Sequence, residues 1–377
     1  MDLTIITTYR CDSKCSMCYI WMHPTDPKEE ITTTILEKLP EGFDNLNITG
    51  GEPTLRKDIE ELCDVLYPKA RILEISSNGL HAERILPIIK KYPNIKVRFS
   101  LEGFEKTNNR IRGEEDGFNK KVRGLKMLQE VGGTDLGFGA VIQDDNIDEL
   151  VELYRFAMTN GFEFATSALH NAFQFHKGDN FPYDREKVAR KVEKIIIEML
   201  KTNNIKNWFR AYLNLGLIEK ILGHDRLIKC TAGEDFVFID PWSDVYLCNV
   251  RNDLLAGNLK KQSWKDIQTS KLYKEKINNV DQCKQNCWMV TTARTAMRSR
   301  FHPSLPKLQV LKWVLKNKLK VNLGKEISFD DYINFDKIHK DSVVNKRESF
   351  LLQKGVKRVI TKAEQLHYNQ FEKYDNR

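Results

Sequence analysis

The 377-residue sequence contains no apolar run of roughly 18 residues, the length that a helix needs to cross a bilayer. Its first residues, MDLTIITTYR, lack the basic segment, apolar segment and cleavage site of a secretory signal. Glycine (20 residues) and proline (11 residues) are too few for a collagen or a low-complexity disordered chain. We therefore expect a soluble, cytoplasmic protein with one or two domains and a substantial core.

Cysteine is also scarce, and its eight residues are poor candidates for disulfides because cytosolic reductants keep thiols reduced. Three of them form the triplet Cys11-x3-Cys15-x2-Cys18, directly after a strand-like run. A structural zinc site needs four ligands, whereas three thiolates leave one iron of a [4Fe–4S] cluster open to a substrate or cofactor. The triplet thus favours an iron–sulfur cluster. The alternative is zinc, with a distant His or Cys as fourth ligand.

A second motif, Gly50-Gly51-Glu52-Pro53, follows another short apolar segment. Glycines at such a turn allow backbone conformations and close approaches that a Cβ atom would block. Together with the cysteine triplet, this turn resembles the radical S-adenosylmethionine (radical SAM) superfamily. The resemblance implies that the three cysteines of the triplet hold a [4Fe–4S] cluster whose fourth iron is chelated by SAM.

The same resemblance implies a set of SAM-binding residues. Gly50, Gly51 and Glu52 match the motif that receives the methionine amino group, for which a carbonyl or carboxylate oxygen is a suitable acceptor. Arg112 matches an arginine that pairs with the SAM carboxylate, which suits a guanidinium fork. The other implied contacts, at the ends of later strands, are Ser77, Asn78, Ser100 and, against the adenine, Ile142.

Six strand-like segments alternate with six helical patterns along the first 205 residues. The strands are expected at 3–8, 44–49, 71–77, 95–101, 136–142 and 162–168, and the helices at 31–39, 57–66, 81–91, 116–130, 146–159 and 183–202. These repeats predict an α/β fold, a partial (β/α)6 radical SAM barrel over residues 1–205, with ligands at the carboxyl ends of its strands.

Four further cysteines lie in residues 206–300, which we assign to a small α+β domain: Cys230, Cys248, Cys283 and Cys287. Apolar runs on either side of a Pro-Trp-Ser-Asp turn predict a β-hairpin over 236–248, and a helical pattern follows at 263–278. Four cysteines on such a unit suit zinc if taken alone. After a radical SAM barrel they resemble the twitch domain, a shortened SPASM domain, which implies an auxiliary [4Fe–4S] cluster without an open iron.

The implied reaction is reductive cleavage of SAM by an electron from a donor such as flavodoxin or ferredoxin, followed by hydrogen abstraction from an unactivated carbon by a 5′-deoxyadenosyl radical. An auxiliary cluster can accept the remaining electron. This favours a radical SAM oxidoreductase that dehydrogenates a sugar-like, cyclitol or lipid-linked small molecule. A peptide-modifying or epimerising enzyme is the alternative within the family, and a non-catalytic zinc-binding adaptor is the alternative outside it. The chain enters its first strand directly, without a peptide-recognition domain, which argues against a peptide substrate but leaves that alternative open.

Two residues outside these motifs need separate interpretations. His170 follows the sixth strand, where an imidazole could take a proton from a substrate hydroxyl; a hydrogen-bonded loop histidine is the alternative. Cys63 lies on a predicted apolar helix face, and such a cysteine is usually a small core residue.

The tail, residues 301–377, holds 16 Lys plus Arg against 9 Asp plus Glu, a net charge of +7 of the +8 for the whole chain. Leu308, Leu311, Leu315 and Leu319 share one side of a basic amphipathic helix at 308–320, with Trp313 at its boundary. This pattern fits peripheral contact with an anionic membrane, at the inner surface, but we favour packing of the leucines against the preceding domain. Short basic helices are expected beyond it. No nucleic-acid-binding motif accompanies the charge.

Overall fold

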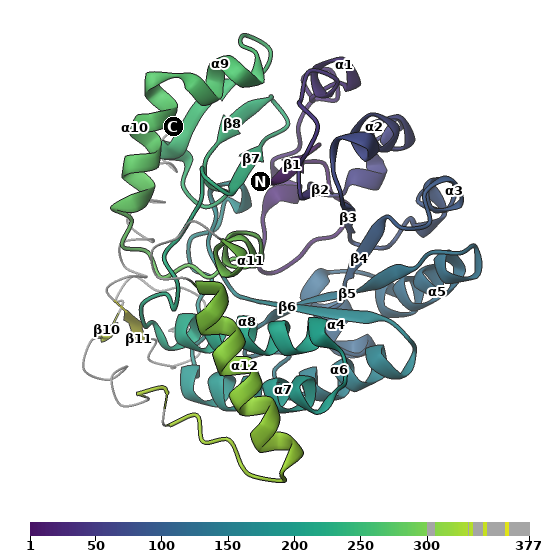
Figure 1. Cartoon of the computed structure of the whole chain (residues 1–377). Helices are drawn as coiled ribbons and strands as arrows, with labels where there is room; N and C mark the ends of the chain where they lie inside the picture. The colour runs from purple at the N-terminus through teal and green to yellow at the C-terminus, as the bar shows by residue number, and fades with distance from the viewer. Residues whose placement is uncertain (300–305, 331, 335–341, 345–358, 362–377) are drawn as a thin grey trace.

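The computed structural model describes residues 1–299, 306–330, 332–334, 342–344 and 359–361 (Figure 1). Its main sheet has nine strands in the spatial order β6-β5-β4-β3-β2-β1-β7-β8-β9. The six strands of the predicted barrel are all present and parallel: β1 (Asp2–Ile6), β2 (Asn45–Thr49), β3 (Leu73–Ser77), β4 (Lys96–Ser100), β5 (Asp135–Ile142) and β6 (Glu163–Ala168). The predicted α/β class with a parallel core is confirmed.

Strand β1 lies in the interior of this sheet, with β2 along one edge and β7 along the other. All five of its residues are buried, and Leu3 and Ile5 have no exposed surface. A strand covered on both faces is expected to be continuously apolar, which is why DLTII carries little alternation. The loop that leaves β1 therefore starts from a buried strand that is paired on both sides.

Helices cover the outer side of the curved sheet (Figure 1). The six helices predicted within the barrel are all present: α1 (Thr33–Leu36), α2 (Ile59–Leu66), α3 (Leu86–Lys91), α5 (Gly117–Glu130), α6 (Leu150–Thr159) and α7 (Arg185–Lys201). The α-helix expected over 81–91 begins only at Leu86, because Pro87 is tolerated in the first turn but not in a helix interior.

Three of the described α-helices were not predicted: α4, α8 and, near the C-terminal end of the second cysteine group, α11 (Val290–Arg298). Helix α4 (Glu105–Arg112) has the polar sequence EKTNNRIR, which offers little apolar periodicity, and it ends at Gly113 with the left-handed φ of 60° typical of a helix C-cap. Helix α8 (Ile205–Leu222) is buried along most of its length and packs against α7 and β6. Its nearly continuous apolar pattern hid the helical period.

The predicted hairpin over 236–248 is confirmed as β7 (Phe236–Ile239) and β8 (Asp244–Tyr246), which pair antiparallel and are followed by β9 (Leu255–Asn258). Its place in the fold was not predicted: β7 pairs in parallel with β1, so the hairpin extends the barrel sheet. The helical stretch that follows divides into α9 (Trp264–Thr269) and α10 (Lys271–Asp281) at Ser270, which caps the second helix.

The tail begins with α12 (Pro306–Asn322), which confirms the predicted helix. The packing that we favoured for its leucines is wrong. They are exposed, and the helix instead buries Val310, Trp313 and Val314 against α7, α8 and α11 (Val290–Arg298). Both faces are partly apolar, so sequence alone could not tell which one packs. Farther along the tail, β10 (Ser342–Val344) and β11 (Val359–Thr361) pair antiparallel, so the short helices predicted there are wrong at these residues. The other segments predicted as short helices fall largely outside the described residues. The described helices include none long and apolar enough to span a membrane.

Candidate functional site

The cysteine triplet lies on the loop that leaves β1. Cys15 is buried, and Cys11 and Cys18 are partly exposed. The Ser16 amide donates to the Ile111 carbonyl at 2.9 Å, which ties this loop to α4. Burial raises the pKa of all three thiols, to about 12 for Cys18, and the charge of the neighbouring Cys15 adds to this effect for Cys11 and Cys18.

These thiols therefore need a cationic partner to ionise, which bound iron supplies. Among the described residues, no group of three or more His, Cys, Asp or Glu converges on a position for one metal ion. A cubane differs from a single ion because each thiolate binds its own iron, so its ligands spread over separate corners. The triplet, three neighbouring thiols on one loop, fits that ligand set.

The Gly-Gly-Glu turn packs directly onto the chain that leads into the triplet. The Gly51 amide donates to the Thr8 carbonyl and the Glu52 amide to the Arg10 carbonyl, both at 2.8 Å. A Cβ atom on Gly51 would lie 2.4 Å from the Arg10 carbonyl oxygen, and one on Gly50 would lie 2.7 Å from that of Thr8. Only glycine fits at both positions without a shift, because the backbone of the turn packs directly against the backbone that leads into the triplet.

Glu52 is fully buried and joins this turn to the end of β3. Its carboxylate accepts hydrogen bonds from the Thr54 amide (2.9 Å) and hydroxyl (2.6 Å), from the Ser77 hydroxyl (2.9 Å) and from the Asn78 amide (2.5 Å). Burial raises the pKa of Glu52, and these hydrogen bonds oppose the rise. Three of the predicted SAM-site residues, Glu52, Ser77 and Asn78, are therefore in direct contact.

The remaining predicted SAM contacts lie farther along the same edge. Ser100 is the last residue of β4 and Ile142 the last of β5. Arg112, at the end of α4, is buried and forms ion pairs of 3.0 Å with Glu102 and Glu114. Because the strands are parallel, their carboxyl ends bring these residues to the edge where the triplet lies.

The partners of Arg112 were missed by sequence reasoning. Glu114 also pairs with the buried Lys121 and accepts from the Ser13 hydroxyl at 2.6 Å, inside the triplet. Two carboxylates and two cations thus balance one another's charge beside Cys15: Glu102, Glu114, Arg112 and Lys121. Such spatial pairing leaves no local sequence signal, although a Lys inside a helix pattern with apolar neighbours hints at burial.

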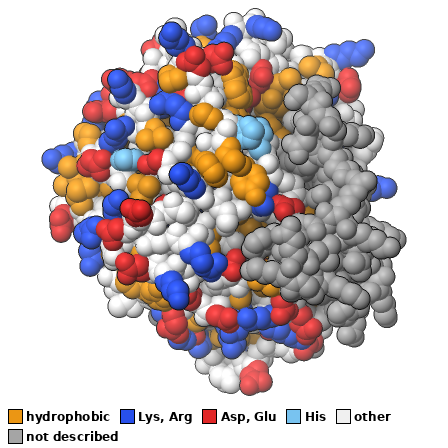
Figure 2. Space-filling model, turned by 180° about the vertical axis from the view of Figure 1, so that it is seen from behind, with side chains coloured by type: hydrophobic (Ala, Val, Ile, Leu, Met, Phe, Trp, Pro, Cys, Tyr) orange, Lys and Arg blue, Asp and Glu red, His pale blue; other side chains and the backbone are white. Residues whose placement is uncertain are grey.

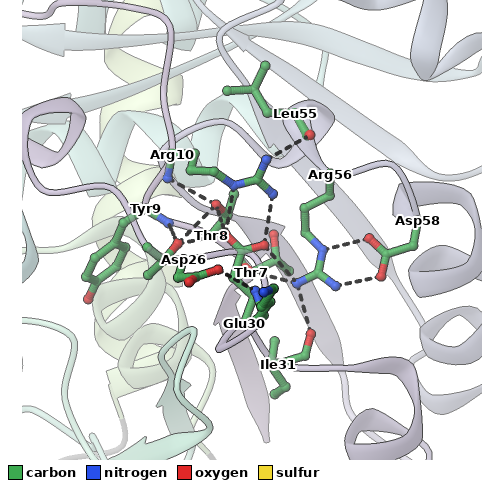
Figure 3. A network of polar contacts seen from close by, with 12 residues as sticks. Thr7, Thr8, Tyr9, Arg10, Asp26, Glu30, Ile31, Leu55, Arg56 and Asp58 are labelled. Atoms are coloured by element: carbon green, nitrogen blue, oxygen red, sulfur yellow. Dashed lines mark hydrogen bonds and ion pairs between the residues drawn. The ribbon is translucent and has the colours of Figure 1, made fainter.

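A second polar network, also missed, holds the chain between β1 and the triplet (Figure 3). Buried Glu30 accepts from the Thr8 and Thr25 hydroxyls and, bidentately, from Arg10 at 2.9 Å. Arg56 donates to the Thr7 and Ile31 carbonyls at 2.9 Å, in addition to its ion pair with Asp58. The network fixes the backbone immediately before Cys11.

The second cysteine group gathers around the end of the β7–β8 hairpin. Burial raises the pKa of Cys248 and of Cys287. The charges of the neighbouring cysteines add to this rise, Cys287 and Cys230 for Cys248, and Cys230 and Cys283 for Cys287. The Val250 amide donates to Cys248 Sγ at 3.3 Å, and Arg226 lies 3.8 Å from Cys287 Sγ. Hydrogen bonds to sulfur are a feature of cluster-binding thiolates, so these four residues fit an iron–sulfur cluster as well.

His170 lies between the barrel edge and the second cysteine group. Its Nδ1 atom is 3.1 Å from the Ala168 carbonyl, at the end of β6. It lines a small cavity together with Asn171, Phe181, Lys220, Gln285, Asn286 and Cys287. The residue thus adjoins a cysteine that is distant in sequence.

Asp240 is a further candidate for a functional residue, and it was not singled out from the sequence. It directly follows β7, whose last residue Ile239 pairs with Ile5 of β1, and burial raises the pKa of Asp240 to about 7. Its carboxylate accepts from the Trp242 and Asp244 amides at 2.9 Å. The Trp242 ring packs edge-on against Tyr9, with centroids 5.1 Å apart, so this turn reaches the triplet loop. An acidic residue directly after an apolar strand was the available signal.

Two family models match this chain. Residues 5–157 match the radical SAM superfamily, and residues 230–288 match the SPASM iron–sulfur cluster-binding domain. The matches cover both cysteine groups. The chain thus carries a radical SAM domain and a C-terminal SPASM domain, the combination found in radical SAM enzymes of the SPASM type. The predicted SAM, SAM-binding [4Fe–4S] cluster and auxiliary cluster are the cofactors of these two domains.

Three individual proteins with similar sequences or structures share 20 to 30% of their residues with this chain where they align. The chain is 27% identical to the mycofactocin maturase MftC of Mycolicibacterium smegmatis, over 72% of this chain and 71% of that protein. It is 30% identical to the Fe-coproporphyrin III synthase of Methanosarcina barkeri, over 39% of this chain and 38% of that protein. The structure of Streptococcus suis SuiB bound to S-adenosylmethionine aligns with a TM-score of 0.55 and 20% identity, over 73% of this chain and 67% of that one, so the two share a fold.

Proposed function

We propose that this protein is a radical SAM oxidoreductase that dehydrogenates a hydroxyl-bearing carbon of its substrate. The observation that carries the proposal is the parallel pairing of β7 with β1. It puts the hairpin of the second cysteine group in the same sheet as the strand that leads into the triplet. A substrate bound between the two cysteine groups would face the 5′-deoxyadenosyl radical on one side, which takes a hydrogen atom. On its other side it would face the auxiliary cluster, which takes an electron.

In this proposal Cys11, Cys15 and Cys18 hold the SAM-binding cluster, and the four cysteines of the SPASM domain hold the auxiliary cluster. The SAM site is formed by Gly50, Gly51, Glu52, Ser77, Asn78, Ser100, Arg112 and Ile142. When bound, these groups supply a 5′-deoxyadenosyl radical that removes a hydrogen atom from carbon, and an acceptor for the electron left on the substrate. An external donor such as flavodoxin or ferredoxin provides the electron that starts the reaction.

The chain's own residues must bind the substrate and take the hydroxyl proton. In this proposal the imidazole of His170 takes the hydroxyl proton, because His170 lines a cavity together with Cys287. Loss of one hydrogen atom, one proton and one electron converts a carbinol to a carbonyl and balances the reaction. A sugar, a cyclitol or a lipid-linked small molecule has such a carbon.

A second candidate is modification of a peptide. It is favoured by the 27% identity to a mycofactocin maturase over most of both chains. The two candidates share the chemistry of SAM cleavage and differ in the substrate, so one assay can address both.

The test is incubation of the anaerobically purified holoenzyme with SAM and a strong reductant, followed by chromatographic measurement of 5′-deoxyadenosine. We expect its formation by the wild type and none by Cys15→Ala, with Cys63→Ala as the matched control because Cys63 is a buried core thiol. Addition of a polyol-rich metabolite fraction should increase the yield and give products that lack two hydrogens. Absence of 5′-deoxyadenosine contradicts the proposal, and stimulation by peptides alone favours the second candidate.

A further inference from the structure

Helix α12 has two opposite faces with different surroundings. One face is anchored: Trp313 packs edge-on against Tyr212 of α8, with ring centroids 5.4 Å apart. Lys318 donates to the Lys201 and Thr202 carbonyls at the end of α7, at 3.4 and 3.0 Å. Because these contacts hold the helix in one orientation across α7 and α8 (Figure 1), its outer face is also fixed.

The outer face carries a continuous row of leucines. They recur at intervals of three and four residues, as one face of an α-helix requires, and 40 to 59% of their surface is exposed: Leu308, Leu311, Leu315 and Leu319. Leu323 continues the row beyond the helix and is 61% exposed. Five of the eleven exposed large hydrophobic side chains in the described part of the chain thus lie in this one row. Scattered exposed leucines are ordinary, but a contiguous row marks an interaction surface.

Lysines flank the row on both sides. Lys307, Lys312 and Lys316 are exposed and Lys320 is partly exposed. No acidic residue occurs from 306 to 325. The remainder of the protein differs, because residues 1–300 hold 44 basic and 43 acidic side chains, and the face seen in Figure 2 has the two kinds interspersed. The positive charge is therefore local to the leucine row.

We propose that α12 docks on the surface of an anionic lipid bilayer, parallel to the membrane plane. The leucines enter the boundary between headgroups and acyl chains, while the flanking lysines extend to lipid phosphates. Charge decides between this partner and a second copy of the chain, because two copies that met through this face would bring lysines against lysines. The inference concerns the helix alone and holds for either candidate reaction.

The test is sedimentation of the full-length holoenzyme with vesicles of phosphatidylcholine alone or mixed with phosphatidylglycerol. We expect binding to the mixed vesicles, weaker binding at high salt, and little binding to phosphatidylcholine. The variant Lys307→Gln/Lys312→Gln/Lys320→Gln should bind more weakly by about fivefold per lysine. The variant Leu311→Ser/Leu315→Ser/Leu319→Ser should bind more weakly by about tenfold per leucine.

The matched control changes three exposed hydrophobic residues elsewhere, Ile205→Ser/Leu255→Ser/Leu272→Ser, and should bind as the wild type does. All substituted positions are exposed or partly exposed, so equal circular dichroism and iron content should show that each variant folds. Equal binding by the leucine variant and the control would overturn the proposal, as would equal binding of the wild type to both kinds of vesicle. A lipid-free dimer that the leucine variant abolishes would also overturn it.

Discussion

Replacement of Gly51 by alanine tests the contact on which the candidate site depends. The new Cβ would lie 2.4 Å from the Arg10 carbonyl oxygen and 2.7 Å from that of Tyr9. Neither oxygen belongs to a flexible side chain, and Arg10 is the residue before Cys11. The turn and the cysteine loop must therefore separate.

The cost can be estimated from two effects. Overpacking against backbone costs about 1–3 kcal/mol. Separation also weakens the two hydrogen bonds that Gly51 and Glu52 donate to Thr8 and Arg10, each worth about 1 kcal/mol. We expect a loss of about 2–4 kcal/mol in the free energy of unfolding, measured by urea denaturation. Because the loop holds the reacting groups, 5′-deoxyadenosine formation should fall about 100-fold.

Gly139→Ala is the matched control. Gly139 lies in β5 of the same sheet, and a Cβ there would have no neighbour within 4 Å. Alanine at such a site is expected to change stability by less than about 1 kcal/mol, and in the stabilising direction. Equal stability and equal activity of the two variants would refute the close-approach argument.

Two further predictions concern buried charge. Glu30→Gln leaves Arg10 without its bidentate carboxylate and should destabilise the protein by about 3 kcal/mol in urea titrations, with weaker SAM binding; a change below about 0.5 kcal/mol would contradict the role of this network. Burial opposes ionisation of Asp135, but Arg98 outweighs it and lowers the pKa to about 2. That pair should therefore contribute about 2 kcal/mol above about pH 4, lost as the pH falls towards 2. Asp135→Asn should remove this part of the acid dependence, and parallel stability curves for variant and wild type would speak against it.

Local sequence patterns were sufficient for the strands and for placing several candidate site residues at the strand ends. Each barrel strand was found near its predicted position because apolar runs end at polar turns, and parallel strands bring those turns to one edge. The sequence also predicted that the glycines of the Gly-Gly-Glu motif permit a close approach. The structure identifies the neighbouring atoms as backbone carbonyl oxygens of residues 8–10.

Features that depend on distant residues could not be predicted in this way. The pairing of β7 with β1 joins segments more than 200 residues apart, and periodicity carries no information on such partners. The ion pairs of Arg112 depend equally on spatial neighbours, and its predicted role at SAM stays a prediction. The burial of Trp313, with the leucines of α12 left outside, reflects which of two apolar faces fits α7 and α8.

The most direct test of the central claim is iron content measured together with SAM cleavage after anaerobic reconstitution. The wild type should carry about eight irons per chain, one cubane in each cysteine group. The variant Cys11→Ala/Cys15→Ala/Cys18→Ala should lose about half of this iron and all 5′-deoxyadenosine formation. The variant Cys230→Ala/Cys248→Ala/Cys283→Ala/Cys287→Ala should lose the other half. A wild-type protein that binds zinc but no iron, or a triplet variant that still cleaves SAM, would contradict the account.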